Sequence, residues 1–179
     1  YLEMDVHATS DGAVVVIHDS TLDRTTNGKG AVAEHTREQV SRLDAGYWFT
    51  RDGKTFPYRD QGVRVPTLES VLNAFPDQCF NIEIKQEHPP VVDAVVRALE
   101  RTGTGNRVLL AAERDSVMGA IRNAVGGGMA TGMCVGDVVD FMDRFARNDW
   151  EDYHPPGRAL QIPTRFEGMD LVTEATVAA

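Results

Sequence analysis

Polar and apolar residues alternate at the start of the chain. The polar members are Glu3, Asp5 and His7, and the apolar members are Leu2, Met4 and Val6. Side chains of a strand point to opposite faces with a period of two. We therefore predict a strand that carries three polar groups on one face and apolar side chains on the other.

A run of β-branched residues follows at Val14–Ile17, after the turn sequence Ser10-Asp11-Gly12. Such a run is typical of a strand buried on both faces, as in a parallel sheet. It ends in His18-Asp19, and ionisable residues at the exit of a buried parallel strand are where α/β barrels keep their chemistry.

The remaining chain alternates between period-two and helical patterns. Strands are predicted at 80–85, 108–112, 129–135, 159–162 and 170–172, and helices at 36–43, 67–75, 90–101, 115–125, 137–147 and from 173 onward. Thr36, Thr67 and Thr173 are candidate N-caps. This order predicts βαβ units and a parallel sheet, about six or seven strands in all.

The fold class expected from this order is α/β, a TIM (β/α)₈ barrel. A complete barrel of this type takes roughly 250 residues, whereas the chain has 179, opens in a strand and stops in a helix. We therefore expect residues 1–179 to form one partial domain that lacks the first strand and the C-terminal strand or strands.

An aromatic and charged segment at 44–65 interrupts the alternation. It is too long for a plain connection and too aromatic for a linker. We expect an excursion packed over one end of the domain. Its aromatic residues could form a wall for a lipid or alcohol group, or pack the excursion onto its own barrel.

Composition excludes some classes of protein. The net charge of -9 argues against a nucleic-acid surface, and no run of about 18 apolar residues indicates a transmembrane segment. Because the chain opens inside a predicted strand, the lack of a leader leaves cytoplasmic and periplasmic or secreted locations equally open. Cys79 and Cys134 are expected to be small core residues, with a disulfide as the alternative.

Three acidic residues form the candidate metal site. Glu3 and Asp5 share one face of the first strand, and Glu83 alternates with Ile82 and Ile84 in a later one. Three carboxylates without thiolates suit Mg²⁺ or Ca²⁺ better than zinc. The alternative is that Glu3 and Asp5 are charges on an edge strand facing water.

Two further residues are candidates for catalysis. His18 could act as acid or base, oriented by Asp19, although a lone histidine is more often structural. Lys85 would point into the barrel beside Glu83, where an ammonium is costly unless it faces an anion. We expect it to contact a phosphate oxygen; the alternative is a salt bridge to Glu83.

Weaker signals mark possible substrate contacts. His7 shares the face of Glu3 and Asp5 and could contact substrate or serve a structural role at a loop tip. Gln161 and Glu113 end later predicted strands at the same rim, so position alone places them near substrate. Arg24 and the turn at 27–30 could cradle a phosphate, but a turn that folds the loop over the barrel mouth is the more economical interpretation.

Three motifs resemble those of the glycerophosphodiester phosphodiesterase family. They are LEMDVHATSDGAVVVIHDSTLDRTTNGKG at 2–30, VPTLESVL at 65–72 and NIEIK at 81–85. The resemblance implies Glu3, Asp5 and Glu83 as metal ligands. It also implies two histidines, one at His18 and one in a His-Arg-Gly segment that does not occur among these 179 residues.

The resemblance implies a hydrolase that cleaves a glycerophosphodiester into glycerol 3-phosphate and an alcohol with the help of Mg²⁺ or Ca²⁺. Its partner would be a small phosphodiester, such as a glycerophosphocholine-like molecule or a lysophospholipid. Alternatives are a lysophospholipase D acting on lipid substrates, and a catalytically incompetent fragment or phosphodiester- or metal-binding barrel. Without the histidine of the His-Arg-Gly segment, we expect little hydrolysis.

Overall fold

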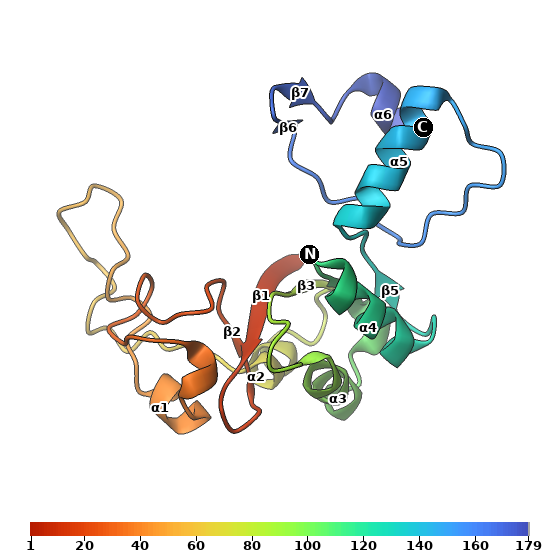
Figure 1. Ribbon diagram of the computed structural model, residues 1–179. Coiled ribbons are helices and arrows are strands. Elements are labelled where there is room, and N and C mark those ends of the chain that lie inside the picture. Colours follow the sequence, from red (N-terminus) through yellow and green to blue (C-terminus); the bar gives the residue numbers. More distant parts are fainter. Residues whose placement is uncertain (179) are drawn as a thin grey trace.

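The computed structural model describes residues 1–178 and contains one five-stranded sheet with the strand order β2-β1-β3-β4-β5 (Figure 1). The parallel strands are β1 (Leu2–Ala8), β3 (Phe80–Ile84), β4 (Val108–Ala111) and β5 (Ala130–Thr131). The predicted α/β class with a parallel sheet is therefore confirmed.

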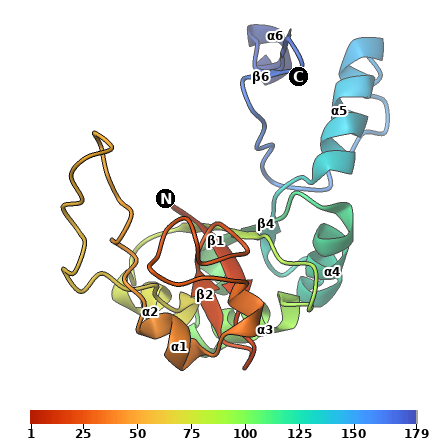
Figure 2. The same ribbon diagram turned by 60° about the vertical axis from the view of Figure 1, so that its left-hand side comes forward.

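Helices α2 (Leu68–Ala74), α3 (Val92–Thr102) and α4 (Asp115–Val125) follow or separate these strands and pack beside the sheet (Figures 1 and 2). The main core lies between them: Ile82 and Leu110 of the sheet are fully buried with Leu72, Leu99 and Ile121 of the helices. Because these side chains are buried together, one face of the sheet packs against the helices. The alternate positions, which carry the polar residues of β1 and β3, are left on the other face.

Three helix starts are capped by the threonines expected from the sequence. Before α6 (Glu174–Ala178), the Thr173 hydroxyl accepts a hydrogen bond from the amide of Thr176. The Thr36 hydroxyl accepts a hydrogen bond from the amide of Gln39, and the Gln39 side chain accepts one from the amide of Thr36, before α1 (Arg37–Ser41). The Thr67 hydroxyl accepts from Ser70 before α2. Each such cap satisfies amides that the first helical turn leaves without partners.

Strand β2 (Val14–Val16) departs from the prediction because it pairs antiparallel with β1, with Val6 opposite Val16. The turn at 10–12 is the reason, since a tight turn reverses the chain whereas a parallel partner needs a long crossover. Gly12 takes the positive φ of 78° that this reversal uses.

Burial of β2 on both faces nevertheless occurs. Val14 contributes to the main core, whereas Val15 and Ile17 belong to a second, smaller cluster with Leu22 and Val65. The second face is therefore covered by the loops that follow β2, not by helices of a barrel.

The C-terminal part also departs from the prediction. Only Ala159 of the expected strand at 159–162 pairs, through a single bridge to Gly132. The expected strand at 170–172 is replaced by a two-stranded hairpin of β6 (Arg165–Phe166) and β7 (Met169–Asp170). Its two turn residues, Glu167 and Gly168, both have positive φ, as the tightest hairpins require.

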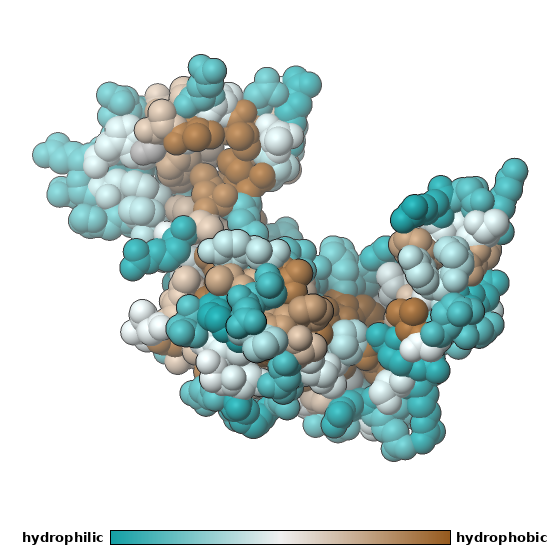
Figure 3. Space-filling model, turned by 180° about the vertical axis from the view of Figure 1, so that it is seen from behind, coloured by the Kyte–Doolittle hydropathy of each residue, from teal (hydrophilic) through white to brown (hydrophobic). Residues whose placement is uncertain are grey.

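Helix α5 (Val135–Arg147), the hairpin and α6 (Glu174–Ala178) stand apart from the sheet (Figures 1 and 2). An ion pair of 2.5 Å between Arg122 of α4 and Asp137 ties the base of α5 to the body. Apolar side chains are exposed on this lobe, seen as brown surface in Figure 3; they include Val139, Phe166, Met169 and Val177. Both cysteines are free, with Cys134 buried and Cys79 half-buried.

No helix within residues 1–178 combines the length and the hydrophobicity that a membrane crossing requires.

Residues 44–65 contain no helix or strand. They form the loop at the left of Figure 1, and they connect α1 to α2 through the short stretch at 66–67.

Candidate functional site

Three carboxylates converge on the polar face of β1 and β3. The parallel register places Asp5 opposite Glu83 and Glu3 opposite Asn81, so the acidic side chains of the two strands are neighbours on the same face. Oxygen atoms of Glu3, Asp5 and Glu83 all lie within 4.8 Å of one another. The alternation expected from the sequence thus brings these three residues together.

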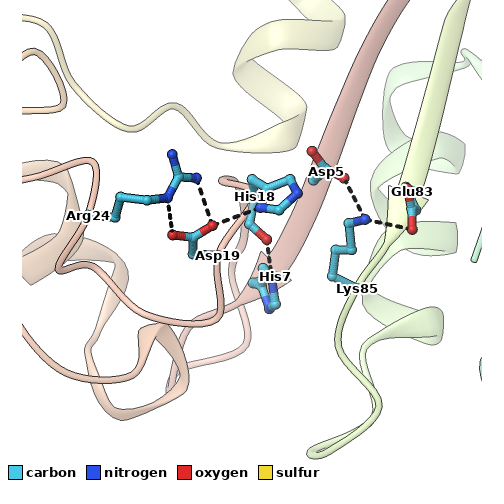
Figure 4. A network of polar contacts seen from close by, with 7 residues as sticks. All are labelled: Asp5, His7, His18, Asp19, Arg24, Glu83 and Lys85. Carbon is cyan, nitrogen blue, oxygen red and sulfur yellow. Dashed lines mark hydrogen bonds and ion pairs between the residues drawn. The ribbon is translucent and has the colours of Figure 1, made fainter. Parts of the chain in front are cut away.

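Lys85 lies directly beside this acidic cluster (Figure 4). Its Nζ atom is 2.8 Å from Glu83 Oε1 and 3.4 Å from Asp5 Oδ1. All three side chains are less than a quarter exposed. The salt bridge considered from the sequence as the alternative role of Lys85 is therefore formed, and it extends to a second carboxylate.

The charges of the cluster shift the pKa values of its members. Crowding by the protein around the Glu3 carboxylate, and then the charges of Asp5 and Glu83, raise the pKa of Glu3, although the residue as a whole remains exposed. Burial lowers the pKa of Lys85, but hydrogen bonds and charge from Glu83 and Asp5 outweigh this, so its net shift is upward. Lys85 therefore carries a full positive charge next to the acids.

His18 is held by a chain of polar contacts on the same side of β1 (Figure 4). Its Nδ1 lies 2.7 Å from Asp19 Oδ1, and its side chain is 62% exposed. Arg24 donates two hydrogen bonds to the Asp19 carboxylate, of 2.6 and 2.7 Å. The hydrogen bonds from Arg24 and then from His18 hold the pKa of Asp19 well below its usual range.

His7 is buried beneath His18. Its Nε2 donates a hydrogen bond of 3.2 Å to the backbone carbonyl of His18, and burial lowers the pKa of its imidazole. Nearby, the Gln86 carboxamide accepts from the amide of Ala8 and donates to the carbonyl of Pro89. These contacts fit the structural role that the sequence left open for His7, since they fix the backbone that carries His18.

Gln161 lies away from the acidic cluster. Its Oε1 is beside Gly132. The bridge between Gly132 and Ala159 puts this segment beyond β5, and β5 is itself three strands from β1 in the sheet order. A cavity of about 400 Å³ lies between α5 and residues 150–160, and its lining includes neither Gln161 nor any other candidate residue.

The contacts of two residues near the site, Asn81 and Arg24, do not follow from the predictions made from the sequence. Asn81 shares the polar face with Glu83, and its buried Oδ1 has no hydrogen-bond partner among the described residues; the alternation in Asn81–Lys85 was a signal for it. Arg24 was considered only as a weak phosphate contact. No periodicity connects it to Asp19, because a loop brings the two side chains together.

Comparison with known proteins gives the family. The model of the glycerophosphoryl diester phosphodiesterase family matches residues 1–120. A glycerophosphodiester phosphodiesterase of Caldanaerobacter subterraneus is 40% identical over 114 residues, covering 61% of this chain and 44% of the relative. One from Bacillus subtilis is 37% identical over 108 residues, covering 56% of this chain and 36% of the relative. The chain thus spans less than half the length of these two relatives.

Solved structures of phosphodiesterases superpose on this chain. The glycerophosphoryl diester phosphodiesterase domain of an uncharacterized Mycobacterium tuberculosis protein superposes with a TM-score of 0.81 at 25% identity, covering 98% of this chain and 70% of that one. An Oleispira antarctica phosphodiesterase in complex with the product sn-glycerol-3-phosphate superposes at 0.63 with 25% identity, covering 74% of this chain and 53% of that one. These structural neighbours are TIM barrels, in keeping with the predicted fold class. With its family match over residues 1–120, the chain belongs to the glycerophosphoryl diester phosphodiesterase family.

Proposed function

We propose that this chain carries the metal-binding half of an active site that hydrolyses a glycerophosphodiester to glycerol 3-phosphate and an alcohol. The observation that supports this most is the convergence of Glu3, Asp5 and Glu83 next to Lys85. We assign residues 1–179 to one partial catalytic domain, with 44–65 as an excursion from it.

The three acids fit a divalent cation of the hard, oxygen-binding kind. Mg²⁺ and Ca²⁺ bind oxygen at about 2.0–2.6 Å, so ligands of one ion lie within roughly 5 Å of each other. The candidate oxygens meet this condition. The chemistry that a divalent cation supplies when bound there is neutralisation of the negative charge that builds on the phosphoryl oxygens in the transition state. Ligand type does not choose between the two ions.

His18 is the proposed proton carrier. Because Nδ1 is bonded to the Asp19 carboxylate, Nε2 is the ring nitrogen that takes up or releases the proton. Asp19, held by Arg24, keeps the ring in one orientation and one tautomer. Which step His18 serves, deprotonating the nucleophile or protonating the leaving alcohol, depends on its position relative to the bound phosphodiester.

Lys85 is the proposed phosphate contact. Its ammonium is mobile on a flexible stem, and its present partners are two of the three acids that would hold the cation. Once those acids are neutralised by a cation, the ammonium is released to pair with a phosphoryl oxygen. Gln161 and His7 remain proposals as substrate contacts, and the burial of His7 favours an indirect role for it.

The activity test uses a protein that contains these residues together with a His-Arg-Gly strand. We expect release of choline from glycerophosphocholine, loss of the activity in EDTA, and a fall of about 10²–10⁴-fold in His18→Ala, the usual contribution of general acid–base catalysis. His154→Ala, which removes an exposed histidine from the loop that follows α5, is the matched control and should remain active. Full turnover by His18→Ala would contradict the role proposed for His18. Full turnover by the 179-residue chain alone would contradict the expected need for the histidine of the His-Arg-Gly segment.

A lysophospholipase D activity is the second candidate, because the excursion exposes aromatic side chains suited to an acyl chain. Comparing turnover on glycerophosphocholine and lysophosphatidylcholine separates the two functions. Binding of glycerol 3-phosphate without product from either compound would instead support a barrel that binds phosphodiesters without cleaving them.

A further inference from the structure

The excursion at 44–65 differs from the rest of the chain in charge and composition. It holds five of the aromatic residues and has four basic residues against three acidic ones, whereas the whole chain has a net charge of -9. Figures 1 and 2 both show it projecting from the body of the molecule as a loop. It is therefore a local basic and aromatic protrusion on an acidic protein.

The base of the excursion is firmly attached. The buried Asp44 carboxylate accepts hydrogen bonds from the amides of Gly46 and Asp60, at 2.8 and 2.7 Å. The amide of Ala45 bonds to the carbonyl of Val63, and Val65 enters the second hydrophobic cluster. These contacts close the loop at its base, so the residues beyond it are presented in a defined arrangement.

One aromatic group fills the interior of the excursion. The Arg59 guanidinium lies 4.2 Å from the ring centre of Tyr47 and 4.1 Å from that of Phe56, and its Nε bonds to the Tyr47 carbonyl. Arg59 is therefore engaged by the two rings and by this hydrogen bond. It stabilises the loop internally, and other cations of the excursion are the ones available to an external partner.

Three aromatic side chains of the excursion are nearly half exposed: Trp48 at 47%, Phe49 at 45% and Tyr58 at 46%. Trp48 also contacts the rings of Tyr47 and Phe56 edge to face, and Phe49 and Tyr58 contact each other in the same way. Exposing three large aromatic side chains on one short segment is unfavourable in water. Such exposure is typical of a surface that a protein partner or a membrane covers.

Cations stand beside these aromatic residues. Arg51 and Lys54 are exposed, and within residues 1–178 neither forms an ion pair. The intervening Asp52 turns its carboxylate back into the loop, where it accepts hydrogen bonds from the amides of Lys54 and Thr55. The two cations are thus exposed and unpaired within the described residues, whereas the Asp52 carboxylate is hydrogen-bonded within its own turn.

We propose that the excursion docks on an anionic lipid–water interface. Tryptophan and tyrosine rings favour the headgroup layer of a membrane, and each Lys or Arg near an anionic surface strengthens binding about fivefold. A protruding loop suits a broad lipid surface better than it suits a peptide, which needs a groove. This docking goes beyond the proposed hydrolysis and does not depend on it.

The experiment measures partition of the 179-residue chain onto vesicles of phosphatidylcholine alone and of phosphatidylcholine with phosphatidylglycerol. We expect binding to the anionic vesicles, weakening with salt. Trp48→Ala with Phe49→Ala should lower the partition coefficient about tenfold or more, and Arg51→Gln with Lys54→Gln by roughly 25-fold. The matched control, Phe166→Ala with Met169→Ala, removes two apolar side chains of the β6–β7 hairpin that are even more exposed, at 56% and 60%, and should bind like the parent.

A spectroscopic measurement keeps the proposal testable if a variant misfolds. Trp48 and Trp150 are the two tryptophans, so Trp150→Phe leaves Trp48 as the single reporter. Its emission should shift to shorter wavelength on anionic vesicles. Equal binding to both kinds of vesicle, loss of binding in the hairpin control, or a Trp48 spectrum unchanged at saturating lipid would each overturn the proposal.

Discussion

At the scale of the residue, Lys85 makes the acidic cluster tolerable in the folded chain. Three carboxylates within 4.8 Å repel one another, and the ammonium offsets this by pairing with Glu83 and Asp5. The same pairing would compete with a cation for those oxygens. We therefore expect Lys85 to affect both the stability of the fold and the proposed binding of a metal ion.

Lys85→Met should separate these effects. We expect lower thermal stability without divalent ions, because the acids lose their counter-ion, and about fivefold tighter binding of Ca²⁺ or Mg²⁺, since a partly exposed ion pair is worth on the order of 1 kcal/mol. Affinity for glycerol 3-phosphate should fall. Titration calorimetry measures both affinities, and Lys54→Met, in the excursion, is the control. Unchanged metal affinity in Lys85→Met would mean that the ammonium does not compete.

The positions of candidate residues were predictable from the sequence where strand periodicity determines the side-chain direction. Glu3, Asp5 and Glu83 follow from alternation in two strands, because the pleat sends every second side chain to the same face. The contact between Arg24 and Asp19 was not predictable, because it depends on the path of an irregular loop. The strand expected to carry Gln161 forms only one bridge, so strand alternation does not place this side chain.

At the scale of the element, the shape of the excursion depends on a close approach of two backbone segments. A β-carbon at Gly46 would lie 2.4 Å from the carbonyl oxygen of Tyr58, which no real side chain permits. Glycine at this position allows the two backbone segments of the loop to meet, and so helps to place the exposed aromatic residues.

Gly46→Ala should displace the segment around Tyr58 and destabilise the protein by about 1–3 kcal/mol, the usual range for overpacking. Urea unfolding provides the measurement. Gly119→Ala is the matched control, since a β-carbon there meets nothing within 4 Å, and in the middle of α4 it should stabilise by roughly 0.5–1 kcal/mol. A Gly46→Ala protein as stable as the parent would show that the loop does not rely on this contact.

Elements with strong local signals were predicted well. Thr36 and Thr67 mark the starts of α1 and α2, and the helical stripe after residue 90 becomes α3. The predicted parallel direction of β2 was wrong. A run of β-branched residues indicates burial on both faces, but it does not indicate which elements cover those faces or how the strand pairs. The predictions of the C-terminal strands were wrong, because a short apolar run next to a proline does not by itself determine that the segment pairs with a neighbouring strand.

At the scale of the whole molecule, β1 and β3 connect the core to the site. Their apolar residues pack against helices α2, α3 and α4 on one face, and their acidic residues meet on the other. The site is therefore assembled only when residues about 80 positions apart in the sequence pair in the correct register. A cation bound between the two strands should stabilise the entire fold, because the unfolded chain does not bring the three acids together.

The measurement that tests this account most directly is Ca²⁺ and Mg²⁺ titration of the 179-residue chain and of Glu83→Gln, by calorimetry and thermal unfolding. We expect the parent to bind one ion and to melt at higher temperature with it. Glu83→Gln should remain folded and bind at least about tenfold more weakly, since even groups that only support a ligand change affinity by roughly 10–100-fold. Glu87→Gln, which alters an acid paired with Arg114 outside the cluster, should bind like the parent. Equal affinity and an equal thermal shift in Glu83→Gln would contradict a metal site formed by Glu3, Asp5 and Glu83.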